Sequence, residues 1–168
     1  MHSGNSLLSF IGDTPLVRLK SSETPGSGQV WCKLEFMNPA GSSKDRMCKA
    51  IVESMEAEGT LRPGDTLVEA SCGNTAISLA MISAAKGYSL MLVMPDTVSR
   101  ERRRLLAAFG AQIVATSPSN GMKGSVERAL ELLSSGERTV MINQFDNPAN
   151  PEVHRRTTAV EILRDLDR

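Results

Sequence analysis

The sequence predicts an α/β fold: a four-stranded parallel sheet flanked by helices, with two further strands near the N-terminus. Short apolar segments at residues 66–70, 88–94, 111–115 and 139–143 alternate with stretches of helical periodicity. Short strand–helix–strand connections and right-handed crossovers make a parallel sheet the expected arrangement. The length of 168 residues is sufficient for one domain with its own core.

Two strands and a helix are expected before this sheet begins. Strands at residues 15–19 and 29–35 flank the turn-rich segment 21–28. A helix at residues 43–58 follows them, and an apolar face is expected on it. That face consists of Met47, Ala50, Ile51 and Met55.

Helices alternate with the strands of the sheet. The first begins at Asn74 and ends at Gly87, a residue typical of helix C-termini. An arginine-rich helix ends at Gly110, and its charge run favours a solvated face over a phosphate or nucleic-acid patch. A third helix carries an apolar stripe, and a polar helix runs from His154 onward. The stripe consists of Met122, Val126, Ala129, Leu130 and Leu133.

One lysine stands in the first turn of the helix at residues 43–58. An Asn-Pro dipeptide ends the strand before it, and Ser42 and Asp45 have the spacing of a capping box. The helix macrodipole is positive at this end, so the neutral, nucleophilic amine of Lys44 is favoured over its ammonium. Enzymes that form a Schiff base need such a lysine, and the alternative is a solvated surface lysine.

Two more polar segments follow expected strands. Ser71-Cys72-Gly73-Asn74-Thr75 comes directly after residues 66–70, and Gln144 comes directly after residues 139–143. Small polar residues between a strand and a helix bind anions through backbone N–H groups and the helix dipole. Ligands bind beyond the carboxyl ends of parallel strands, so both segments are expected at one ligand-binding edge.

These segments resemble the cysteine synthase family, the O-acetylserine sulfhydrylases that use pyridoxal phosphate (PLP), and more broadly the fold-type II PLP enzymes. The resemblance covers nearly all of the chain, and several ordered motifs make it specific. The motifs are Ile11-Gly12-Asp13-Thr14-Pro15-Leu16-Val17, Lys33-Leu34-Glu35, Asn38 to Arg46, Met94-Pro95-Asp96, Ser99-Arg100-Glu101-Arg102-Arg103, Phe109-Gly110-Ala111 and Asn147-Pro148-Ala149-Asn150-Pro151.

The resemblance implies PLP as cofactor and assigns the site residues. Lys44 matches the lysine that holds PLP and, once released, acts as the base. Asn74 is expected to hydrogen-bond the cofactor ring hydroxyl. Gln144 is expected to help hold the substrate carboxylate. The loop that receives this carboxylate contains Ser71, Cys72, Gly73 and Thr75.

The implied reaction is a β-replacement that forms L-cysteine from O-acetylserine, or a related activated serine, and sulfide or thiosulfate. Two alternatives stay open. One is another fold-type II lyase, such as a cystathionine β-synthase or a serine/threonine dehydratase. The other is a catalytically inactive chain that acts as a binding partner. Three residues depart from the family pattern: Cys72 replaces a serine, and Ala76 and Ala159 replace glycines.

The resemblance also implies a division of the chain. Residues 1–40 would hold N-terminal strands of an incomplete large domain, and residues 41–150 a small α/β domain with the PLP lysine. Residues 151–168 would form a helix that leads towards the missing large domain. The family's phosphate-binding loop comes later in its sequences, so this chain is expected to be an N-terminal half with little activity alone.

Composition excludes several classes of function. Nineteen basic and 19 acidic residues balance, which gives no electrostatic reason to bind nucleic acid or an anionic membrane. No stretch approaches the roughly 20 apolar residues of a membrane span. Three cysteines without a CxxC pair argue against a disulfide framework and a zinc site, and favour a reducing, cytoplasmic location without a metal. By resemblance, the partners are an amino-acid substrate, a second copy in a homodimer, and serine acetyltransferase.

Overall fold

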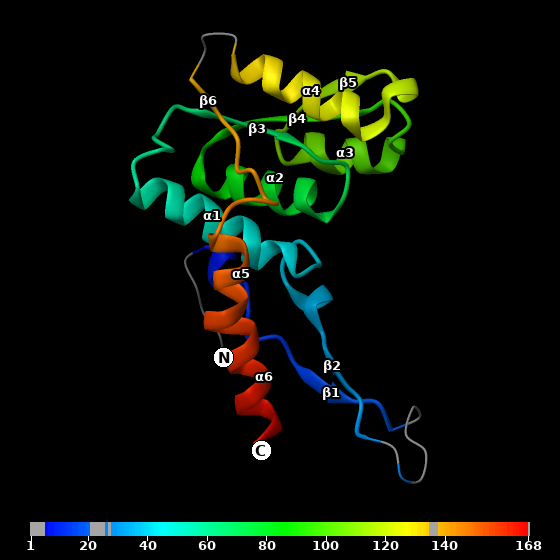
Figure 1. Ribbon diagram of the computed structural model, residues 1–168, viewed down its shortest axis with the longest axis vertical. Helices are drawn as coiled ribbons and strands as arrows, with labels where there is room; N and C mark the ends of the chain where they lie inside the picture. Colours follow the sequence, from blue (N-terminus) through cyan, green and yellow to red (C-terminus); the bar gives the residue numbers. More distant parts are fainter. Residues whose placement is uncertain (1–5, 21–25, 27, 135–137, 168) are drawn as a thin grey trace.

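The computed structural model describes residues 6–20, 26, 28–134 and 138–167. A parallel sheet lies at one end of the molecule, and a long helix and a two-stranded hairpin extend away from it (Figure 1). The sheet has the strand order β5-β4-β3-β6, and all its neighbours are parallel. Its strands are β3 (Thr66–Ala70), β4 (Ser89–Pro95), β5 (Gln112–Thr116) and β6 (Thr139–Val140). The predicted four-stranded parallel α/β sheet is therefore confirmed.

Helices cover both faces of this sheet (Figure 1). One face packs against α1 (Lys44–Ala57), α2 (Asn74–Lys86) and α3 (Arg100–Ala108), and the other packs against α4 (Gly121–Leu133). Successive side chains of β3 enter opposite cores: Leu67 lies in the α1–α2 core and Val68 in the α4 core. Both are fully buried, as expected for a strand covered on both faces.

The apolar stripe predicted for α4 is largely wrong. Met122, Val126 and Leu130 are exposed, whereas Gly124, Ser125 and Ala129 are buried. Small side chains let α4 lie close to the sheet, so the larger apolar residues point outward. Ser125 also shares a 2.8 Å hydrogen bond with Thr116 at the end of β5.

The N-terminal strands form a separate antiparallel hairpin of β1 (Leu16–Arg18) and β2 (Trp31–Lys33), shorter than the sequence predicts. Short 3₁₀ turns precede and follow it, η1 (Leu7–Phe10) and η3 (Glu35–Met37), and a third, η4 (Pro118–Asn120), precedes α4.

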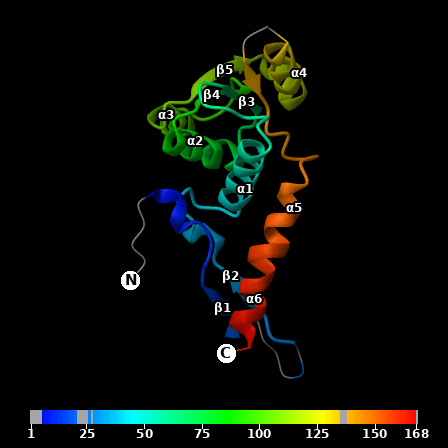
Figure 2. The same cartoon turned by 90° about the vertical axis from the view of Figure 1, so that its left-hand side faces the viewer.

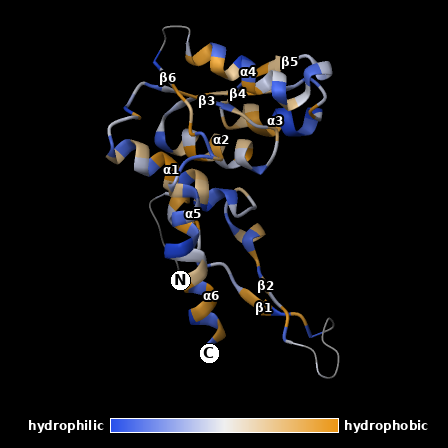
Figure 3. Cartoon of the chain, viewed as in Figure 1, coloured by the Kyte–Doolittle hydropathy of each residue, from blue (hydrophilic) through white to orange (hydrophobic). Residues whose placement is uncertain are grey.

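One long helical segment ends the described chain (Figure 2). It comprises α5 (Ala149–Val153), the π-helical turn η5 (His154–Thr158) and α6 (Ala159–Leu166). It begins before His154, the predicted start, and it is not polar throughout. Val160, Leu163 and Leu166 are exposed apolar residues of α6, and further apolar residues lie in the hairpin (Figure 3).

A buried ion network ties the C-terminal helix to α1 and to the N-terminal segment. Arg46 of α1 donates to both oxygens of Glu161 at 2.6 and 2.7 Å and to both oxygens of Glu35 at 2.9 Å. Lys33 Nζ lies 2.7 Å from the same Glu161 carboxylate. Burial alone would raise the pKa of Glu161, but hydrogen bonds from Arg46 and Lys33 outweigh it and lower the pKa to about 2.

Candidate active site

Lys44 lies in the first turn of α1, as the sequence predicts, but the helix end is capped differently. The hydroxyl of Ser42 accepts from the backbone N–H of Lys44 at 3.1 Å. The Asp45 carboxylate accepts from the backbone N–H of Ala40 at 2.6 Å, where a capping box would have it accept from Ser42. The left-handed backbone at Gly41 (φ 84°) folds the loop back over the helix end, which presents the Ala40 N–H to Asp45.

The side chain of Lys44 is half-buried, and its amine is free. Among the described residues, Lys44 Nζ has no hydrogen-bond or ion-pair partner. Lys20 is exposed. The other described lysines are paired: Lys33 with Glu161, Lys49 with Glu53, Lys86 with Glu56 and Lys123 with Glu127. Lys44 is thus a partly shielded amine that no carboxylate neutralises.

Contacts across the fold bring the three predicted segments together. Ser78 in α2 donates to Asp45 beside Lys44, and the Cys48 thiol lies 3.8 Å from the carbonyl of Thr75. These contacts pair the N-terminal turns of α1 and α2. Thr75 in turn donates to Oε1 of Gln144 at 2.6 Å, so the segment after β6 joins the same edge.

The loop from Ser71 to Thr75 connects β3 to α2 and faces open space at its centre. Gly73 is the N-cap of α2, and no side chain caps this helix. A Cβ placed on Gly73 would meet nothing within 4 Å. Asn74 is exposed, whereas Ser71 and Thr75 are buried. The uncapped N–H groups at this helix end can receive an anion.

Arg102 reaches this loop from α3. Its Nη1 donates to the carbonyl of Cys72 at 2.7 Å. The neighbouring Arg103 pairs with Asp96 at 2.6 Å. The predicted solvated face agrees with the exposure of Arg100, Arg102 and Arg104, whereas Arg103 is half-buried. The Ser-Arg-Glu-Arg-Arg motif was the signal that could have indicated the contact.

Glu69 is a second residue that sequence reasoning missed, because it stands within an apolar strand. Its side chain is 4% exposed and accepts hydrogen bonds from the backbone N–H groups of Ile142 and Asn143. Burial raises the pKa of Glu69 to about 7 despite these two bonds. Among the described residues its Oε2 has no hydrogen-bond partner.

The charge of Lys44 acts on the side chain of His154 in η5. Its Nδ1 shares a 2.9 Å hydrogen bond with Thr158. Burial lowers the pKa of His154, and the positive charges of Lys44 and Arg46 lower it further.

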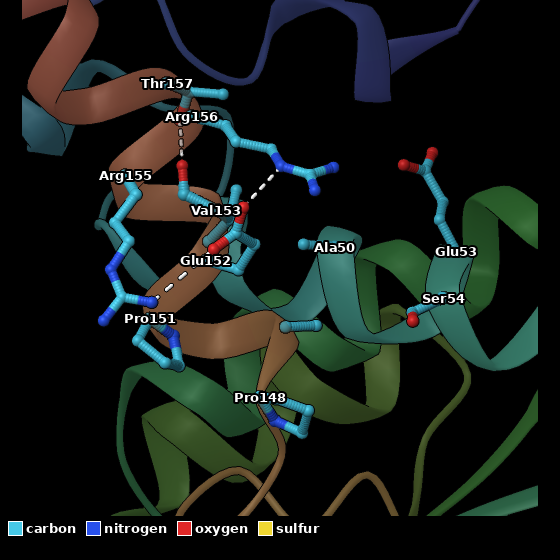
Figure 4. Close-up of a pocket in the computed structure, with 11 residues that line it drawn as sticks. Ala50, Glu53, Ser54, Pro148, Pro151, Glu152, Val153, Arg155, Arg156 and Thr157 are labelled. Carbon is cyan, nitrogen blue, oxygen red and sulfur yellow. Dashed lines mark hydrogen bonds and ion pairs between the residues drawn. The ribbon is translucent and has the colours of Figure 1, made fainter.

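A cavity of about 650 Å³ lies apart from these residues, between α1 and the segment formed by α5 and η5 (Figure 4). Arg155 and Arg156 both pair with Glu152 in it, at 3.6 and 2.6 Å. None of the predicted site residues lines this cavity. The predicted site is instead an open edge of the sheet.

Two further properties concern the described part of the chain as a whole. It contains no group of three or more His, Cys, Asp or Glu side chains that could hold a metal ion. None of its helices combines the length and apolar character that a membrane crossing requires.

Comparisons with known proteins agree with this arrangement. The family described as "Pyridoxal-phosphate dependent enzyme" matches residues 7–168. A cysteine synthase of Staphylococcus aureus is 45% identical over 163 residues, which cover 97% of this chain and 52% of that protein.

Solved structures give the same result. The cysteine synthase (OASS) of Entamoeba histolytica matches with a TM-score of 0.93 and 36% identity, over 99% of this chain and 50% of that chain. O-ureido-L-serine synthase matches with a TM-score of 0.90 and 47% identity, over 98% of this chain and 51% of that chain. The chain thus spans about half the length of the relatives it matches, and the resemblance indicated by the sequence motifs is confirmed.

Proposed function

Because the chain belongs to the pyridoxal-phosphate dependent enzymes, we propose that it carries the lysine and the substrate-binding loop of a cysteine synthase-type active site. The observation that carries this proposal is the half-buried, unpaired amine of Lys44 at the start of α1. The first turns of this helix contact the N-terminal turns of α2, which follow the polar loop from Ser71 to Thr75. The 45% identity to a cysteine synthase supports the same reaction class.

The donor set at this edge fits PLP. Lys44 offers a free amine for the cofactor aldehyde, and Asn74 offers an exposed amide for the ring hydroxyl. The open space at Gly73 leaves room for a ligand above the N-terminus of α2. When bound, PLP supplies an electron sink for the charge that develops at the substrate α-carbon.

Residues of the chain bind the substrate carboxylate and transfer the substrate proton. The backbone N–H groups of the loop bind the substrate carboxylate. The hydroxyl of Thr75 donates its one proton to Oε1 of Gln144, which leaves the Nε2 group of Gln144 to donate to that carboxylate. Lys44 Nζ takes the proton from the substrate α-carbon.

The substrates follow from the reaction class. The electrophile is O-acetylserine or a related activated serine, whose leaving group departs from the β-carbon. The nucleophile is sulfide or thiosulfate, and the product is L-cysteine. A homodimer and an association with serine acetyltransferase are proposed on the family resemblance.

Covalent mapping tests the proposal. The chain is incubated with PLP, reduced with borohydride and digested, and the modified peptide is identified by mass spectrometry. We expect the adduct on Lys44, with loss of labelling in Lys44→Ala. Lys49→Ala is the matched control, because Lys49 is also half-buried in α1 but is paired with Glu53. Equal labelling of Lys20, Lys33, Lys49, Lys86 and Lys123 would refute the proposal.

A further inference from the structure

The hydrogen bonds between β3 and the segment of β6 have two kinds of acceptor: backbone carbonyls at the start and a side chain further along. The two strands pair in register at Thr66 with Thr139 and at Leu67 with Val140, and the ladder then stops. Beyond it, the N–H groups of Ile142 and Asn143 donate to the side chain of Glu69. A carboxyl group therefore takes the place of backbone carbonyls as the acceptor for this segment.

The segment held by Glu69 is bent. Asn143 has a φ of 47°, in the left-handed region that a non-glycine residue adopts only where neighbouring contacts fix it. The bend turns the chain, so that the next residue, Gln144, points its amide at Thr75. Asn150 fixes the bend from the other side, since its Nδ2 donates to the Gln144 carbonyl at 2.9 Å.

We propose that Glu69 is a positioning residue for the substrate-carboxylate site: it holds the bent backbone at Asn143 and thereby sets Gln144 against Thr75. Glu69 touches neither substrate nor cofactor in this role. The role of Gln144 at the carboxylate rests on the proposed function, whereas the link from Glu69 to Gln144 does not.

Ionisable groups of α1 interact electrostatically with Glu69. On α1, burial raises the pKa of the Cys48 thiol, and the negative charges of Glu69 and Asp45 raise it further. The positive charge of Lys44 acts on this thiol in the opposite direction and lowers its pKa.

Solution NMR of the isotope-labelled chain tests this inference with two variants. Glu69→Ala removes the acceptor, and Glu69→Gln keeps an acceptor oxygen in place. We expect the alanine variant to shift the side-chain amide signals of Gln144 and to speed exchange of the Asn143 amide by about tenfold or more. The glutamine variant should restore both to near their original values.

Leu92→Ala is the matched control, because Leu92 is the fully buried cross-strand neighbour of Glu69 on the side away from β6. Its cavity should lower global stability and leave the Gln144 signals unmoved. Unchanged Gln144 signals in a folded Glu69→Ala chain, or equal shifts in Leu92→Ala, would overturn the inference.

A measurement on the unsubstituted chain covers the case in which Glu69→Ala does not fold. The carboxyl carbon of Glu69 is titrated, with the carbons of Asp45 and Cys48 followed separately. The chemical shift of the Gln144 side-chain amide should change with pH at the same midpoint as the Glu69 carboxyl carbon. A Gln144 shift that does not change at this midpoint would overturn the inference. PLP labelling of Lys44, run in parallel, should be the same in Glu69→Ala and the unsubstituted chain. Its absence from both would refute the proposed function and leave the link between Glu69 and Gln144 standing.

Discussion

The hydroxyl of Thr75 donates a 2.6 Å hydrogen bond to Oε1 of Gln144, a residue 69 positions away in the sequence. Both side chains are buried, and each belongs to a segment that follows a parallel strand. This bond closes the loop after β3 onto the segment after β6. It is the direct physical link between two of the three motifs that define the candidate site.

Thr75→Val should destabilise the chain, because the Gln144 oxygen would lose its buried donor. We expect a loss of about 1–3 kcal/mol in the free energy of unfolding, the usual cost of one unsatisfied buried polar group. Urea denaturation followed by circular dichroism measures it. Thr75→Ser keeps the hydroxyl and should remain within about 1 kcal/mol of the original chain. A valine variant as stable as the serine variant would contradict the importance of this bond.

The sequence indicates most of the sheet because its strands are short apolar runs bounded by turn residues. Residues 66–70 were predicted correctly, and residues 88–94 differ from β4 by one position at each end. The strand predicted at residues 139–143 is a ladder of only two residues. Its last N–H groups bond to the Glu69 side chain, a contact that no local pattern contains.

In the candidate site, too, local features could be predicted from the sequence and contacts between distant residues could not. Lys44 and the Ser71–Thr75 loop stand out because each occupies a helix N-terminus, a feature that local sequence encodes. Arg46 with Glu161 could not be found by this route, since 115 residues separate the pair. Nothing in the periodicity of either helix marks the contact.

Because of the Arg46–Glu161 pair, the free energy of unfolding should decrease at acidic pH. The pKa of Glu161 is about 2 in the folded chain and 4.5 in its unperturbed state. A lowered folded pKa contributes stability that is present above about pH 4.5 and is lost as the pH falls towards 2. The full effect is up to about 3 kcal/mol. Urea midpoints measured from pH 2 to 6 should show this slope, and Glu161→Gln should flatten it. A slope that persists in Glu161→Gln would assign it to other carboxylates.

Glu69 should give the opposite slope in a different pH window. Its pKa is raised to about 7 from 4.5, so the folded chain binds the extra proton between these values. Stability is therefore expected to fall as the pH rises from about 4.5 to 7, by up to about 3 kcal/mol. Glu69→Gln should remove this fall and be more stable relative to the original chain at pH 8 than at pH 4. Identical pH profiles of the two chains would show that Glu69 keeps an ordinary pKa.

Arg102→Ala should loosen the loop after β3 with little effect on global stability. Arg102 is exposed, so we expect less than about 1 kcal/mol in the free energy of unfolding. The lost bond to the Cys72 carbonyl should speed amide exchange in the Ser71–Thr75 loop by severalfold. Arg104→Ala is the control, since Arg104 is an exposed arginine of the same helix. Equal exchange in both variants would mean that Arg102 does not restrain the loop.

Cys72→Ser should tighten anion binding at the loop. Cys72 is half-buried in the segment that we propose receives the substrate carboxylate, and its thiol is a weak hydrogen-bond donor. A serine hydroxyl at the same position donates more strongly, which corresponds to an affinity gain of about threefold to tenfold for a carboxylate. Titration of the loop amides with O-acetylserine, followed by NMR, measures this gain.

Cys72→Ala separates hydrogen bonding from volume, because it removes the thiol without adding a donor. If the alanine and serine variants bind the ligand equally, the residue at position 72 does not contact the carboxylate, and the assignment of the loop must shift to Gly73 and Thr75.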